Sequence, residues 1–132
     1  QFTGPIPPEL GNLTNLIDLW LDNNQLSGPI PSELGNLSPL IVLSLDNNQL
    51  VGTIPTDLGD LGSLYDLKLQ NNPLTGSIPM SFMKLKLHNF HFENTSICEP
   101  ADPDFGIWKA TVVDWIGTNL TCINCYLPLI AR

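Results

Sequence analysis

The regular spacing of one asparagine constrains this chain more than any other feature. Asn24, Asn48 and Asn72 follow one another at intervals of 24 residues. The same template surrounds each of them, reading LTNLIDLWLDNNQLSGPIPSELGN from Leu13, LSPLIVLSLDNNQLVGTIPTDLGD from Leu37 and LGSLYDLKLQNNPLTGSIPMSFMK from Leu61. A fixed period of this length is the signature of a solenoid, in which each copy packs only on its neighbours. The repeat therefore predicts the fold before any single helix or strand is assigned.

A pair of leucines marks the strand of each copy. The pairs are Leu19/Leu21, Leu43/Leu45 and Leu67/Leu69. Each pair alternates with polar residues, which is the period of a strand with one buried face. One copy cannot bury its own leucines, so the copies must stack as parallel strands about 4.8 Å apart and share one core.

The residues after each strand predict how the chain turns back. Each of the three spaced asparagines can direct its amide inward and hydrogen-bond backbone groups of its own turn and of the neighbouring copy. The glycines that permit a positive φ or a close backbone approach are Gly28, Gly52 and Gly76. The pairs that then impose extended backbone are Ile30-Pro31, Ile54-Pro55 and Ile78-Pro79. Single helical turns are predicted to follow at Ser32-Glu33-Leu34 and Thr56-Asp57-Leu58.

Taken together, the pattern Leu-x-x-Leu-x-x-Leu-x-Leu-x-x-Asn-x-Leu-x-Gly-x-Ile-Pro resembles the plant-type leucine-rich repeats of receptor-kinase ectodomains and polygalacturonase-inhibiting proteins. The resemblance covers residues 2 to about 97. It implies an α/β solenoid: a right-handed superhelix with a parallel concave β-sheet, short 3-10 or irregular convex turns and a second, shorter sheet. Members of the family are mostly secreted binding proteins, and the pattern carries no catalytic residues to transfer.

The two ends of the chain differ. Residues 1–97 are expected to hold about four repeats, the first incomplete, because Phe2-Thr3-Gly4-Pro5-Ile6-Pro7 aligns with the middle of a later copy. No amino-terminal cysteine cap precedes it, which departs from the family pattern. Three explanations remain open: upstream residues are absent, a partner covers the end, or copies stack end to end. Residues 98–125 are expected to form a disulfide-bonded cap, and residues 126–132 a tail or linker.

The fourth repeat is one residue short, and a helix is predicted after it. Phe90-His91-Phe92 takes the Leu-x-Leu place, and Thr95 replaces the spaced asparagine. From Asp102 the period becomes helical, and the residues that would share one helical face are Phe105, Trp108, Val112, Trp115 and Ile116. Such a helix is suited to lie across the last repeat as its cap.

Cys98 and Cys122 bracket this predicted helix, which is where a cap disulfide is expected. The bridge is worth about 3–4 kcal/mol in the chain-entropy model and indicates an oxidising compartment. Cys125 is left over: it can replace Cys122 in the bridge, remain a thiol or link to another chain. The Cys122-x-x-Cys125 spacing lacks the setting of a redox motif and a second pair of zinc ligands.

The outward positions of the strands are predicted to form a concave binding surface. The candidate contact residues are Asp18, Trp20, Asp22, Ser44, Asp46, Asp66, Lys68, Gln70, His91 and Glu93. Trp20 is the first choice, because a tryptophan held outward on a rigid sheet is a typical binding anchor. The alternative is that Trp20 only covers neighbouring side chains or touches a missing upstream repeat. For the face as a whole, the alternative is a solvated polar surface that keeps the protein soluble. The excess of acids on this face favours a basic or hydroxyl-rich partner.

Several classes of function are disfavoured. The net charge of −8 repels phosphate backbones and anionic membranes, and no apolar run approaches the length of a membrane span. His88, His91 and Glu93 form the one cluster that invites a catalytic or metal reading, but no nucleophile accompanies them. We therefore expect neither an enzyme nor a cofactor. The glycosylation acceptors, if the source glycosylates, are Asn12, Asn94 and Asn119, with Asn36 weakened by Pro39.

The sequence thus predicts an extracellular or cell-surface recognition module that binds a protein, peptide or glycan on its concave face. The alternative is a structural surface or filament component that assembles through its uncapped amino end. Ice binding is a third hypothesis, and the irregular series Trp20, Ser44, Lys68, His91 counts against it. The identity of the ligand is not encoded in the repeat.

Overall fold

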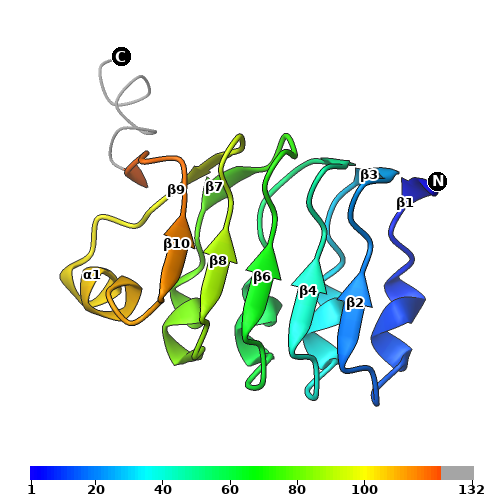
Figure 1. Cartoon of the computed structure of the whole chain (residues 1–132), viewed down its shortest axis with the longest axis horizontal. Coiled ribbons are helices and arrows are strands. Elements are labelled where there is room, and N and C mark those ends of the chain that lie inside the picture. Colours follow the sequence, from blue (N-terminus) through cyan, green and yellow to red (C-terminus); the bar gives the residue numbers. More distant parts are fainter. Residues whose placement is uncertain (123–132) are drawn as a thin grey trace.

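The computed structural model describes residues 1–122, which form a single row of stacked coils (Figure 1). One strand from each coil contributes to a five-stranded parallel sheet in the order β10-β8-β6-β4-β2. Its strands are β2 (Asp18–Trp20), β4 (Val42–Ser44), β6 (Asp66–Lys68), β8 (Asn89–His91) and β10 (Asp114–Ile116). The register places Leu19 beside Leu43, Leu43 beside Leu67 and Leu67 beside Phe90. The predicted Leu-x-Leu strands and the substitution of Phe90 for leucine are confirmed.

A second set of strands forms the additional sheet that the resemblance implied. They are β1 (Thr3–Pro5), β3 (Gln25–Gly28), β5 (Gln49–Leu50), β7 (Thr75–Ser77) and β9 (Ser96–Cys98). The first three pair as one sheet and the last two as another, with a parallel bridge between Gly52 and Leu74 linking the two groups. Gly52 has a φ of 82°, a conformation that glycine adopts without steric cost.

Each of the first four coils contains a five-residue 3-10 helix. These helices are η1 (Pro8–Asn12), η2 (Ser32–Asn36), η3 (Thr56–Asp60) and η4 (Met80–Lys84). Each begins directly after a proline in extended conformation and carries no side-chain cap. The helical turns predicted after Pro31 and Pro55 are therefore confirmed. Close stacking requires glycine here, because a Cβ on Gly35 would collide with the backbone carbonyl of Asp57 in the next coil.

The spaced asparagines hydrogen-bond backbone groups as predicted. Asn48 is 8% exposed, and its Oδ1 accepts from the backbone N–H of Leu26 at 3.0 Å. Its Nδ2 donates to the carbonyl oxygens of Leu21 at 2.9 Å, Leu45 at 3.0 Å and Asp46 at 3.2 Å. Two coils are joined by one side chain, so each asparagine satisfies buried polar groups of its neighbour as well as its own.

The predicted long helix is wrong in its second half. The helix α1 covers only Pro103–Lys109, and Trp115 lies on β10, which pairs with β8 as a fifth concave strand. The helix ends early because three successive β-branched residues disfavour it: Thr111, Val112 and Val113. The open edge of β8 meanwhile offers hydrogen bonds that a continued helix would leave unmade.

Aromatic side chains close this end of the core. The cluster comprises Phe82, Phe90, Phe92, Phe105, Trp108 and Trp115, with ring centroids 4.8–6.0 Å apart in the recorded pairs. Trp108 donates from Nε1 to the carbonyl of Leu85 at 2.9 Å, so its one polar atom is satisfied. Asp102 caps α1 by accepting from the N–H of Asp104 and of Phe105.

Cys98 and Cys122 are both buried beside this cap. No bond joins these two sulfurs in the structure, so the Cys98–Cys122 bridge remains a prediction. Cys125, the other partner that the sequence offers, lies outside the described residues, as does the predicted tail 126–132. Among residues 1–122, no helix has the length and apolar character needed to cross a membrane.

Candidate functional site on the concave sheet

Corresponding outward residues of successive coils form columns that run across the concave sheet. The first column is Asp18, Val42, Asp66, Asn89 and Asp114, as the strand register shows. The second is Trp20, Ser44, Lys68, His91 and Ile116. By the same offsets, the third is Asp22, Asp46, Gln70, Glu93 and Thr118. Acids outnumber bases in these columns, so a donor-rich or cationic ligand fits the face best.

Trp20 is exposed at the end of the second column, as predicted. Its side chain is 57% exposed, and the Nζ of Lys68 lies 5.9 Å from the centroid of its ring. Ser44 occupies the position between them and is only 1% exposed. Trp20 therefore contributes to packing on its own face while still presenting apolar surface to solvent.

Two of the predicted contact residues are withdrawn from solvent. Ser44 is 1% and Asp46 is 8% exposed, and the hydroxyl of Ser44 donates to Oδ1 of Asp46 at 2.7 Å. The second carboxylate oxygen of Asp46 accepts from Nδ2 of Asn47 at 2.7 Å. This corrects the expectation that both side chains meet a ligand, because Trp20 and Lys68 flank the short serine in the same column.

Three other predicted residues hold acceptor oxygens that are shielded from solvent and have no hydrogen-bond partner among residues 1–122. They are Oδ1 of Asp66, Oε1 of Gln70 and Oε2 of Glu93. Lys68 lies near Asp66 at a separation of 4.0 Å, which is a weak ion pair. A buried acceptor without a donor costs about 1–3 kcal/mol, and these oxygens, like Ser44 and Asp46, are covered by neighbouring atoms.

The histidines are separated by the structure. His91 approaches the Oδ2 of Asp114 with its Nε2 at 2.8 Å. His88 instead stacks on Tyr65, with ring centroids 4.7 Å apart and an interplanar angle of 5°. The sequence does not point to Asp114 as a partner, because its period predicts a helix there and not a strand beside β8.

The glycosylation acceptors occupy exposed positions. Asn12 lies at the end of η1, and Asn94 and Asn119 lie beyond the ends of β8 and β10. Asn94 and Asn119 belong to a further column of exposed asparagines with φ of 55–61°, which also includes Asn23, Asn47 and Asn71. Asparagine is among the residues that tolerate this left-handed conformation, which accounts for the residue type at these positions.

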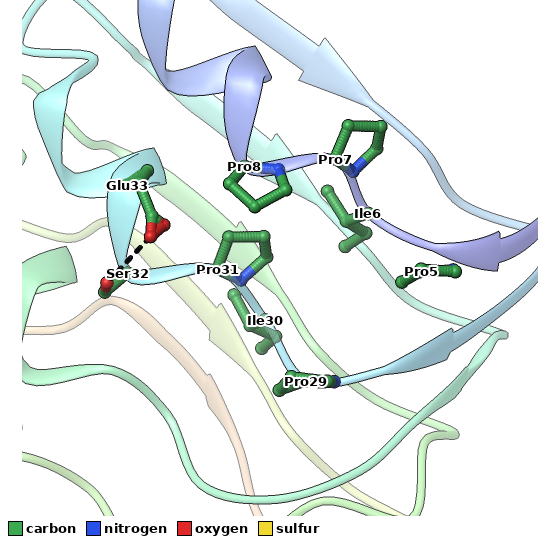
Figure 2. A pocket seen from close by; sticks show the side chains of 9 residues that line it. All are labelled: Pro5, Ile6, Pro7, Pro8, Pro29, Ile30, Pro31, Ser32 and Glu33. Atoms are coloured by element: carbon green, nitrogen blue, oxygen red, sulfur yellow. Dashed lines mark hydrogen bonds between the residues drawn. The ribbon is translucent and has the colours of Figure 1, made fainter.

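An apolar hollow, away from the concave sheet, lies between the second set of strands and the 3-10 helices of the first two coils. Figure 2 shows its two facing rows, Pro5 to Pro8 on one coil and Pro29 to Glu33 on the next. Its volume is about 660 Å³, and its lining is apolar except for Ser32 and Glu33. The hydroxyl of Ser32 is 3.4 Å from a carboxylate oxygen of Glu33. Few polar groups converge here to orient a ligand, so the concave sheet is the stronger candidate.

The leucine-rich repeat family model matches residues 15–37, 39–61 and 63–85, just over half of the chain. The chain belongs to the leucine-rich repeat family. A comparison with curated proteins finds no match. The boundaries of the matched segments follow the 24-residue spacing, so the repeat that predicted the fold is also what defines the family membership.

Solved structures of similar leucine-rich repeat proteins include the plant peptide hormone receptor RGFR1 in complex with RGF2, at 34% identity and a TM-score of 0.81. That match covers 87% of this chain and 18% of the receptor chain. The LRR ectodomain of the receptor kinase GASSHO1/SCHENGEN3 from Arabidopsis thaliana, in complex with CASPARIAN STRIP INTEGRITY FACTOR 2, matches at 38% identity and a TM-score of 0.81. It covers 90% of this chain and 15% of that one.

A plant ice-binding protein is similar at 35% identity and a TM-score of 0.73, over 79% of this chain and 34% of that one. This leucine-rich repeat chain thus spans less than a fifth of the two receptor chains and about a third of the ice-binding protein. The likeness establishes the architecture, while the ligands of these proteins differ with their exposed residues.

Proposed function

We propose that this leucine-rich repeat chain is an extracellular recognition module that binds a basic peptide or protein segment across its concave sheet. The observation that carries the proposal is the excess of carboxylates in the concave columns, among them Asp18, Asp66 and Glu93, next to an exposed Trp20. A lysine or arginine side chain pairs with these carboxylates, and the tryptophan supplies an apolar anchor. The receptors above support the module's class and its location outside the cell, because one is a peptide hormone receptor and the other is the ectodomain of a membrane receptor kinase.

The ligand is expected to be positively charged. Asp18, Asp22, Asp66, Glu93 and Asp114 stand in the concave columns against one lysine and one histidine, Lys68 and His91. Complementary charge speeds association and rejects acidic competitors, and it makes binding weaken with added salt. Peptides selected from a random display library should therefore be enriched in lysine and arginine.

Replacing Trp20 by alanine should weaken binding of the selected peptides by more than 1 kcal/mol, which is roughly a fivefold or greater rise in Kd. The reason is the loss of a large apolar contact that the free protein leaves 57% exposed. Titration calorimetry with a synthetic selected peptide measures the change, and thermal melts check that the fold is retained.

The matched control is Ile107→Ala, because Ile107 is 70% exposed on α1 and away from the concave columns. It should leave the Kd unchanged. An equal Kd for the wild type and for Trp20→Ala, or a library selection without basic enrichment, removes the concave face as the site.

Ice binding is a second candidate function, favoured by one observation. The exposed column Asn23, Asn47, Asn71, Asn94 and Asn119 is regular, unlike the Trp20 column, and amides in it donate to one another at 2.9 Å and 2.7 Å. If the column orders water at ice, Asn71→Asp should abolish inhibition of ice recrystallisation. Absence of such inhibition in the wild-type chain ends this candidate.

A further inference from the structure

A row of apolar and aromatic side chains, most of them exposed, runs across the amino-terminal ends of the concave strands. We call it the edge column; its members are Ile17, Ile41, Tyr65, His88 and Val113, each one residue before a concave strand. Their backbones follow the parallel ladder: the N–H of Ile41 donates to the carbonyl of Ile17 at 2.7 Å, and that of Tyr65 to Ile41 at 2.8 Å. The order of the coils therefore sets these side chains side by side.

The edge column contributes little to the core. Ile17 is 52%, Ile41 41%, Tyr65 47% and Val113 71% exposed. A single exposed apolar residue needs no explanation, but a contiguous row of them on a soluble protein marks an interaction site. His88 extends the row by stacking on Tyr65.

A hollow of about 340 Å³ lies at the carboxyl-terminal end of the row. Tyr65, His88 and Val113 line it together with Leu85, Lys86, Leu87 and Thr111. Its origin is the missing residue of the fourth repeat. In the coil before, the N–H of Leu64 closes a turn on the carbonyl of Leu61 at 2.9 Å. In the fourth coil, Leu85 is extended with a ψ of 151°, and Leu87 takes the corresponding place without that turn.

Charge selects the kind of partner. The neighbouring first column carries Asp18, Asp66 and Asp114 directly beside the edge column. Two copies of this chain packed through this edge would bring these carboxylates together, which disfavours a homodimer. A partner with lysine or arginine flanking an apolar stripe meets both features.

Spacing selects the shape of the partner. Parallel strands lie about 4.8 Å apart, so five coils present a row about 19 Å long. The apolar face of an α-helix repeats about every 5.4 Å along the helix axis, which is close to the spacing between the strands. Alternate residues of an extended strand are about 6.6 Å apart. A helix of about 13 residues has the length of the row.

We propose that the edge column is a docking site for a short, basic, amphipathic helix of a partner protein. The apolar stripe of the helix lies along Ile17, Ile41 and Tyr65, and one large side chain enters the hollow beside Val113. Its basic residues face the aspartates of the first column. This site shares the aspartates of the first column with the concave surface, but its apolar contacts are the edge column and not Trp20, so it does not depend on the Trp20 anchor.

The test uses synthetic 14-residue peptides held helical by a side-chain staple. One carries leucines at helical spacing flanked by arginines; a second has the same composition in scrambled order; a third replaces the arginines by glutamates. Fluorescence anisotropy should show binding of the first peptide only. Equal binding of the scrambled peptide, or no binding of any peptide, overturns the proposal.

Variants of the protein locate the contact. Tyr65→Ser and Val113→Ser should each raise the Kd of the first peptide about tenfold, while Ile107→Ser, an equally exposed change on α1, should leave it unchanged. Val113 is 71% exposed, so its replacement does not threaten the fold. Trp20→Ala should also leave this Kd unchanged, which separates the edge site from the concave site. Insensitivity of binding to both serine variants overturns the proposal.

Discussion

Replacing Phe90 by alanine should lower the free energy of unfolding by about 4 kcal/mol, because burial and packing are both lost. Phe90 is fully buried at the centre of the aromatic cluster, with its ring centroid 4.8 Å from that of Phe92 and 5.3 Å from that of Trp115. The strand that carries it pairs with β6 on one side and β10 on the other. The cavity left by the missing ring cannot close without moving two strands. The loss in unfolding free energy should therefore be near the upper part of the usual range.

Urea unfolding followed by tryptophan fluorescence measures this effect. Trp108 and Trp115 both lie in the cluster and report on it directly. Phe2→Ala is the matched control, since Phe2 is 64% exposed and should change stability by less than about 0.5 kcal/mol. A loss below about 1 kcal/mol for Phe90→Ala would mean that the cluster is not the closed end of the core.

Replacing Asn48 by alanine should lower the free energy of unfolding by about 3 kcal/mol. The change leaves the N–H of Leu26, in the preceding coil, without its partner at 3.0 Å. The carbonyl of Leu21 loses the donor at 2.9 Å and keeps the bond from Asn24. The carbonyl of Leu45 likewise loses one donor and keeps the bond from Asn72. Each buried group left unsatisfied costs about 1–3 kcal/mol, and the small cavity adds to this.

Asn15→Ala is the control for this substitution, because Asn15 is exposed in the loop before β2. It should be neutral within about 0.5 kcal/mol. Hydrogen exchange adds a second readout: the amide of Leu26 should lose protection in Asn48→Ala more than amides of distant coils. Retained protection of Leu26 would show that the asparagine does not join the coils.

The sequence predicted the features that depend on a local period. Leucines at alternate positions mark β2, β4 and β6, and the single spaced asparagine marks the turn after each strand. Pro31 and Pro55 restrict the backbone before and after themselves, so the 3-10 helices after them were also predictable. These features need no knowledge of distant contacts beyond the fact that equal copies stack.

The candidate site was predicted in outline only. Trp20 and Lys68 lie on the concave face as expected, but the burial of Ser44 depends on which residues flank it in the neighbouring coils. A column is visible in the sequence once the register is known. How far a short side chain is covered by long neighbours follows from packing across strands, which a one-dimensional pattern does not contain.

The sequence by itself therefore determined the solenoid, its parallel sheets and its family, because a repeat specifies the same local structure in every copy. The tertiary structure decided how the repeat ends. Trp115 fits both a helical period and a strand period. It lies on a strand because β10 forms backbone hydrogen bonds with the open edge of β8. The tertiary structure also set Ile17, Ile41 and Tyr65 in one row. Residues 24 positions apart become neighbours only when the coils stack.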